Sequence, residues 1–222
     1  MALLHRAELT PSKTELLDGW APGQPWFVGE PGLALTTIAA YRFDDPEGEV
    51  GVETLLVRAG DGPTMQVPLT YRGAPLEGAT AALIGTMEHS VLGKRWVYDG
   101  AGDPVYVMTT AAAALSGWHQ AALYVDVDGE RVEREPTALV SGSGSNPVDV
   151  ALPAVQEISS RDEGTVTVVE TPQSVLVIQR ILDGAELARP ASVTGSFADE
   201  AELAGTWTGV SERQQLVLAM AR

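Results

Sequence analysis

The sequence predicts an α+β protein in which antiparallel strands predominate. Segments of strand length are separated by short polar turns, and two other segments begin with a helix cap followed by proline. The clearest strands are expected at 33–44, 50–58 and 65–71. The turn DDPEGE joins the first two and Asp61-Gly62 joins the second two, so these strands are predicted to form an antiparallel meander. Strands at 82–88 and 94–99 are expected to extend it.

Two helices are expected from their capping residues. Thr10 and Pro11 are predicted to be the N-cap and first residue of a helix that ends at Gly19, because proline at the first position loses no hydrogen bond. Asp103-Pro104 begins a second helix by the same rule, and this helix ends at Gly117. A short strand is expected before the first helix, at 2–9.

The second half of the chain is expected to contain strands only. A hairpin is predicted about Asp128-Gly129, and the stretch SGSGSN begins a linker at 141–152. Later strands are expected at 154–160, 165–170, 175–182, 206–210 and 214–221. The chain is therefore predicted to have one domain at 1–140 and a second, β domain at 153–222.

The composition excludes several classes of function. The formal net charge is −16, which repels nucleic acid and anionic lipid, so we expect neither as a partner. The absence of cysteine excludes disulfides, cysteine-bound zinc and a cysteine nucleophile. No signal peptide or long apolar run is present, and a cytoplasmic protein is expected. Open sheet edges make a homodimer a further expectation.

A basic and aromatic cluster is the strongest candidate for a ligand or partner surface. Its residues are Arg72, His89, Lys94, Arg95, Trp96 and Tyr98. An arginine can bind a carboxylate or phosphate through two hydrogen bonds, and Trp96 offers a ring on which a sugar can stack. The alternative is that Trp96 and Tyr98 share one strand face against the core. We expect no catalytic, cofactor-binding or metal-binding residues.

Glu88 and His89 are an alternative candidate for acid–base chemistry, because a carboxylate and an imidazole titrate on either side of neutral pH. Neighbouring side chains of a strand point to opposite faces, however, so these two are not expected to cooperate directly.

Several segments resemble a known family. They are Trp26-Phe27, QVPLTYR (66–72), ALIGTMEHSVLGKRWVYDG (82–100) and DPVY (103–106). Over residues 1–120 the chain resembles the N-terminal cap of actinobacterial maltokinases and the standalone cap-like proteins of the same bacteria. The resemblance implies a curved antiparallel sheet that holds a helix, followed by a second piece that resembles a kinase N-lobe.

The resemblance also implies that this second piece is degenerate. The segment SVLVIQRIL (174–182) fits the family's basic strand at Arg180 and Leu182, but Val177 stands where a lysine would hold ATP phosphates. Residues 161–165 are a reduced form of the nucleotide loop. The sequence contains no segment that supplies the catalytic Asp and the magnesium ligands of a kinase C-lobe, so we expect no phosphoryl transfer.

Three hypotheses about function follow. The first is a non-catalytic binding or regulatory module of glucan, maltose or trehalose metabolism. Its partner would be a kinase-like or glucan-metabolising enzyme, or a small sugar or sugar phosphate. The second is an accessory subunit that completes a sugar kinase in trans, and the third is an enzyme with a site near Glu88 and His89.

Overall fold

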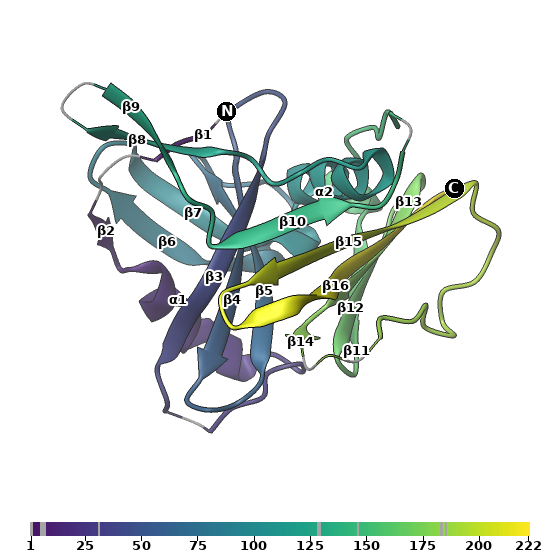
Figure 1. The fold of residues 1–222 in the computed structure, drawn as a ribbon, viewed down its shortest axis with the longest axis horizontal. Coiled ribbons are helices and arrows are strands. Elements are labelled where there is room, and N and C mark those ends of the chain that lie inside the picture. The colour runs from purple at the N-terminus through teal and green to yellow at the C-terminus, as the bar shows by residue number, and fades with distance from the viewer. Residues whose placement is uncertain are drawn as a thin grey trace.

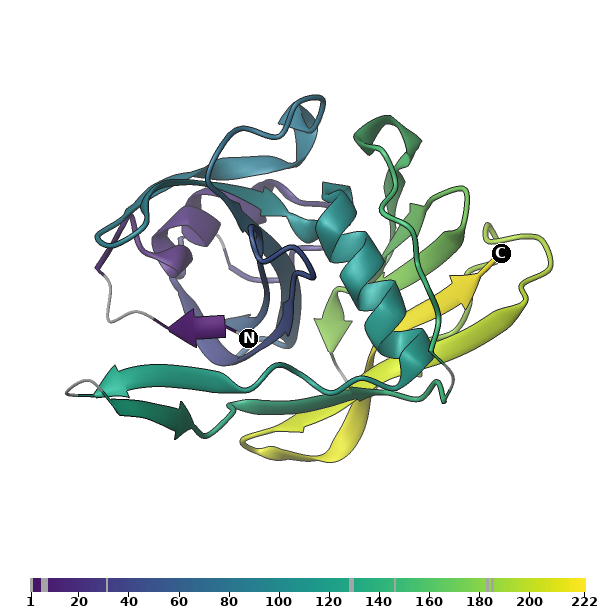
Figure 2. The ribbon, with the colours of Figure 1, turned by 90° about the horizontal axis from the view of Figure 1, so that it is seen from above.

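Two antiparallel sheets and a helix between them form the body of the protein (Figure 1). The computed structural model describes residues 2–4, 8–30, 32–127, 130–145, 147–182, 184 and 186–222. The first sheet contains, in spatial order, β2 (Leu9–Thr10), β6 (Leu83–His89), β7 (Gly93–Asp99), β5 (Thr64–Arg72), β4 (Gly51–Ala59) and β3 (Leu35–Asp44). Figure 2 shows this sheet curled around its own core. The strand-rich α+β class is thus confirmed.

The order of strands in this sheet differs from a simple meander. Strands β3, β4 and β5 are sequential neighbours as predicted, but β5 pairs with β7, which leaves β6 on the far side of β7. The chain from β5 to β6 passes over β7, where the amide of Leu76 donates to the Tyr98 hydroxyl. The crossing segment contains the 3₁₀ helix η2 (Thr80–Ala82).

Helix α1 (Lys13–Trp20) begins two residues later than predicted. Its N-cap is Ser12, whose hydroxyl accepts from the amide of Glu15 while the Glu15 carboxylate accepts from the amide of Ser12. This capping box satisfies two amides at the helix start, which fixes the boundary at Ser12 rather than at Thr10. The helix continues into the 3₁₀ turn η1 (Ala21–Gly23).

Helix α2 (Pro104–Ser116) has the predicted limits and lies between the two sheets (Figure 2). The Asp103 side chain caps its first turn, and Gly117 ends it in the left-handed conformation. The four alanines 111–114 are buried and let the sheets approach the helix closely. The core around α2 contains residues from both sheets, among them Tyr41 and Leu176.

The second sheet has the order β10 (Ala138–Gly142), β15 (Asp199–Trp207), β16 (Val210–Ala221), β13 (Ser174–Gln179), β12 (Val166–Glu170) and β11 (Ser159–Glu163). The last two predicted strands are longer than expected. Strand β13 leads through Arg180 into β14 (Ile181–Leu182), which pairs with β5 of the first sheet. One continuous stretch of chain therefore joins the two sheets.

A small third sheet contains β1 (Ala2–Leu4), β8 (Leu123–Val127) and β9 (Glu130–Arg134). Strands β8 and β9 pair as the predicted hairpin, whereas Asp128-Gly129 lies outside the described residues. The chain after the hairpin turn is divided between β9 and β10, and β10 pairs with β15 of the second sheet.

The start of the predicted linker is packed against α2. The amide of Gly144 donates to the carbonyl of Ala114, and a Cβ on Gly144 would overlap the carbonyl of Leu115. Glycine is needed here for the close approach of two backbones, which its composition alone could not reveal. Residues 141–145 are thus not a free linker, and the division into two domains stays a prediction. No described helix is long and apolar enough to cross a membrane.

A buried glutamine also ties the sheets together. The Gln66 side-chain amide on β5 donates to the carbonyls of Gln179 and Leu216 in the second sheet. Its oxygen accepts from the Tyr41 hydroxyl, so all three contacts are made within the core. The sheets are therefore joined by polar contacts as well as by apolar packing.

Candidate functional site

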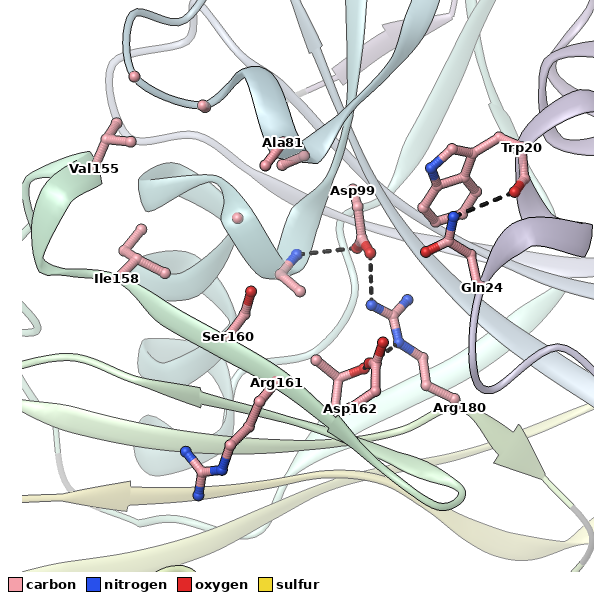
Figure 3. Close-up of a pocket in the computed structure, with 16 residues that line it drawn as sticks. Trp20, Gln24, Ala81, Asp99, Val155, Ile158, Ser160, Arg161, Asp162 and Arg180 are labelled. Atoms are coloured by element: carbon pink, nitrogen blue, oxygen red, sulfur yellow. Dashed lines mark hydrogen bonds and ion pairs between the residues drawn. The ribbon is translucent and has the colours of Figure 1, made fainter.

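A cavity of about 280 Å³ lies where the curled first sheet meets the second sheet (Figure 3). We call it the interface cavity. It is far larger than the ~30 Å³ that one water molecule takes in the liquid. The first-sheet side is lined by the end of α1, the segment 78–82 and the 3₁₀ turn η3 (Gly100–Gly102). The other side is lined by η4 (Val155–Glu157), β11 and β12. Six polar or aromatic side chains carry the argument below: Trp20, Gln24, Asp99, Asp162, Thr167 and Arg180.

Arg180 is the central charged group of the cavity. It sits between β13 and β14, where its amide donates to Thr165 and its carbonyl accepts from Gln66, so its backbone is held by both sheets. The side chain is only 1% exposed, and its guanidinium lies over the ring of Trp26 at 4.8 Å from the ring centre. Such burial of an arginine requires strong partners.

Two of the three guanidinium nitrogens of Arg180 have partners. Its Nε donates to the Thr167 hydroxyl at 2.7 Å, and Nη2 donates to Asp99 at 2.7 Å. Its Nη1 is buried without an acceptor among the described residues. In Figure 3 this nitrogen lies on the side of the guanidinium that faces Gln24, whereas Nη2 is the one bound to Asp99. An unpaired buried donor on a charged group is costly, so an acceptor that reaches Nη1 would be stabilising.

Two carboxylates flank Arg180, one from each sheet. Asp99 ends β7 and also accepts from the amide of Ala101 at the start of η3. Asp162 on β11 accepts from the Thr167 hydroxyl at 2.5 Å. The contacts run from Asp162 through Thr167 and Arg180 to Asp99, so the cavity floor is a continuous polar chain between the two sheets.

An aromatic wall completes the cavity. Trp20, at the end of α1, lines the cavity and lies 5.8 Å from Trp26 in a tilted arrangement. The Gln24 amide donates to the Trp20 carbonyl, which places Gln24 beside the indole (Figure 3). An apolar ring next to fixed polar groups is the usual composition of a site for a small molecule.

Arg161 also lines the cavity but is bound elsewhere. Its guanidinium donates to Glu170, Glu163 and Ser192. The hydrogen bond to Glu170 raises the pKa of Arg161, burial opposes this rise, and the hydrogen bond to Glu163 and the charges of both glutamates add to it, so the pKa lies above its ordinary value. Its charge is therefore already compensated by two carboxylates.

The structure divides the predicted basic and aromatic surface. Trp96 lies opposite Arg72 on β5, and Lys94 lies over the Trp96 ring, so these three share one face of the sheet. Arg72 is bound to Asp103 through two hydrogen bonds of 2.7 Å, and Tyr98 is only 2% exposed. Lys94 and Trp96 are the members of this face that remain available for a ligand.

The other two members lie on the opposite face. Arg95 is the register partner of the buried Met87, and His89 follows two residues later on β6. Arg95 donates to the carbonyl of Leu92 in the β6–β7 turn. The role of the surface as a binding site stays a prediction, but its six residues do not converge on one face.

Glu88 and His89 are separated in the same way. Glu88 lies opposite Lys94, whereas the His89 Nδ1 accepts from the amides of Val91 and Leu92 within the turn. The imidazole is thus part of the turn, and neither residue lines the interface cavity. The geometry gives no support to acid–base chemistry by this pair.

A buried ionic cluster that the sequence did not indicate lies beneath α1. Lys13 of α1 and the Tyr71 hydroxyl both donate to Glu53 on β4. Burial raises the pKa of Glu53, but the charges of Lys13 and Arg42 and these hydrogen bonds outweigh it, so the pKa lies below its ordinary value. Burial, followed by the charge of Glu53, raises the pKa of Tyr71 well above its ordinary value. Neither group titrates near neutral pH, which indicates a structural role.

This cluster gives a prediction about pH. Because the folded-state pKa of Glu53 is depressed, its ionisation stabilises the protein above the ordinary value of 4.5 and stops doing so as the pH falls through the folded-state value. Glu53→Gln should reduce the free energy of unfolding at pH 7 by about 1–2 kcal/mol. Urea titrations from pH 7 to pH 3 should show the variant and the wild type converging below pH 4.5; a constant difference would contradict this assignment.

A comparison with known protein families finds a match for the segment that forms one side of the cavity. Residues 20–103 match the model of the maltokinase N-terminal cap domain. This segment, which we call the cap-like domain, is therefore similar to a maltokinase cap. The resemblance expected from the sequence is thereby confirmed for this segment. A search of curated proteins with the whole chain finds no match.

The cap-like domain contributes about half of the cavity lining. Trp20, Gln24 and Asp99 belong to it, whereas Asp162 and Arg180 come from the chain that follows the match. The cavity exists only because these distant segments meet. Among the charged residues of the lining, Arg180 had a signal in the sequence, because it is the one charged residue of the mainly apolar segment 174–182.

Proposed function

We propose that this chain is a non-catalytic module that binds a small carbohydrate-type metabolite in the interface cavity, within maltose, glucan or trehalose metabolism. The observation that carries the proposal is the buried Arg180, whose Nη1 lacks an acceptor beside a cavity with fixed polar groups and an indole wall. The metabolic context is supported by the cap-like domain, which provides one side of this cavity.

The packing of the second sheet supports a non-catalytic role. In a kinase, a glycine-rich loop is followed by a strand whose lysine binds the phosphates. Here the hairpin β11–β12 turns at Gly164 and β13 follows. The resemblance described from the sequence puts Val177 where that lysine would stand. Val177 is fully buried against Val168 and Leu218, and Leu187 covers the same apolar face. A nucleotide phosphate would find no charged partner there.

The proposal predicts a thermal shift with a carbohydrate. The compounds are maltose, maltose 1-phosphate, trehalose, glucosamine, Mg·ATP and ADP, each tested with the purified chain. A ligand at a hundred times its Kd stabilises a protein by about 2.7 kcal/mol, which raises the Tm of a chain of this size by roughly 5–10 °C.

A cavity-blocking variant shows where the ligand binds. Ala81 is exposed and lines the cavity, so Ala81→Trp should abolish the shift by occupying the space of the ligand. Ala74 is exposed on the same connection but outside the cavity lining, and Ala74→Trp should leave the shift unchanged. A shift with Mg·ATP alone would contradict the non-catalytic proposal. No shift with any compound would contradict cavity binding and favour the accessory-subunit alternative.

A further inference from the structure

The charges around the interface cavity determine what kind of ligand it accepts. Both arginines in the lining already have carboxylate partners: Arg180 is paired with Asp99, and Arg161 is paired with the two glutamates described above. Neither guanidinium therefore offers a net positive charge to an incoming anion.

Asp162 is the remaining charged group of the lining. It accepts from the Thr167 hydroxyl, and no cation lies within ion-pair distance of it among the residues that the structure describes. Asp162 is exposed and lines the cavity, so its other carboxylate lone pairs are open to a ligand there. The cavity is therefore locally negative, within a chain of net charge −16.

Groups that pair well with this lining are hydroxyls. A hydroxyl donates one hydrogen bond and accepts two, so it can donate to a carboxylate and accept from an arginine or an amide. Asp162 provides the acceptor, and the buried Nη1 of Arg180 is a donor that still lacks an acceptor. Trp20 lines the same cavity on the far side of Gln24, and its ring offers an apolar face for the C–H groups of a sugar ring (Figure 3).

A phosphate group is disfavoured at the same place. It carries about −1.5 to −2 charges at neutral pH, and Asp162 would repel it without a free cation to compensate. A charge of this size about 4 Å from the Asp162 carboxylate should therefore weaken binding at least about tenfold.

We propose that the interface cavity binds the uncharged, hydroxyl-bearing part of a carbohydrate and discriminates against its phosphorylated form, with Asp162 as the residue that determines this specificity. The inference rests on the proposed function, since it concerns the ligand of the same cavity. The sequence left both a small sugar and a sugar phosphate open as ligands, and the inference favours the sugar.

The test is isothermal titration with two matched pairs: maltose against maltose 1-phosphate, and trehalose against trehalose 6-phosphate. The neutral member of at least one pair should bind at least about tenfold more tightly than its phosphate. Asp162→Asn should reduce this ratio severalfold by removing the repulsion while keeping the side-chain shape. Asp61→Asn changes the net charge equally at an exposed turn outside the cavity and should leave the ratio unchanged.

The possible failures are distinct. Equal or tighter binding of the phosphorylated member would overturn the inference and leave the proposed function intact. An unchanged ratio in Asp162→Asn would overturn the role of Asp162. If none of the four sugars binds to the folded wild-type protein, the proposed function is overturned together with the inference.

Discussion

Replacing Arg180 by leucine should reduce the free energy of unfolding by about 3–5 kcal/mol, the usual cost of removing one member of a buried ion pair. The variant leaves Asp99 without its guanidinium partner and Thr167 without its donor. It also removes the guanidinium from the Trp26 ring. Because Arg180 joins β13 to β14, the loss should loosen the contact between the two sheets.

Denaturant unfolding of matched variants measures this effect. Arg189 is exposed and lies over the Phe197 ring, so Arg189→Leu makes the same change of charge and volume at the surface and should cost less than about 1 kcal/mol. Combining Arg180→Leu with Asp99→Asn should cost less than the sum of the single changes, because the second removes the unpaired carboxylate. Strict additivity, or wild-type stability of Arg180→Leu, would show that the pair is not the link between the sheets.

Asp103→Ala should have an effect of similar size, about 3–5 kcal/mol. Asp103 is fully buried, and it caps α2 by accepting from the amide of Val105. It also accepts from the Thr70 hydroxyl and from Arg72. Burial lowers the pKa of Arg72, but the hydrogen bonds and charge of Asp103 outweigh it, so the pKa of Arg72 lies above its ordinary value.

The asparagine variant separates the cap from the charge. Asp103→Asn keeps one acceptor for the helix amide but removes the charge that Arg72 needs, so its loss of stability should be smaller than that of Asp103→Ala. Thermal unfolding followed by circular dichroism measures both. Equal losses in the two variants would mean that the helix cap contributes little, and a loss below 1 kcal/mol in both would contradict the assigned network.

Local rules predicted the elements that depend on neighbouring residues. The limits of α2 follow from its capping residues Asp103, Pro104 and Gly117, and the structure confirms them. The start of α1 was predicted wrongly because two capping signals overlap, and the box formed by Ser12 and Glu15 satisfies more amides than Thr10 could.

Features that depend on tertiary contacts were not predicted. The place of β6 beyond β7 depends on the crossing segment that packs over Tyr98. The stretch SGSGSN resembles a linker in composition, whereas Gly144 serves a backbone contact with α2. Five of the six residues of the predicted surface lie within 89–98, and strand alternation distributes the set over two faces. The cavity instead joins residues as distant as Trp20 and Arg180.

The central claim is that a carbohydrate binds between the cap-like domain and the second sheet, and a tryptophan fluorescence titration tests it most directly. Trp20 lines the cavity, whereas Trp96 lies on the surface that the sequence suggested. Titration with the sugar that gives the largest thermal shift should change the emission of the wild type and of Trp96→Phe, and should leave that of Trp20→Phe unchanged. A response that survives in Trp20→Phe and disappears in Trp96→Phe would place the ligand on the surface of β7 and contradict the account.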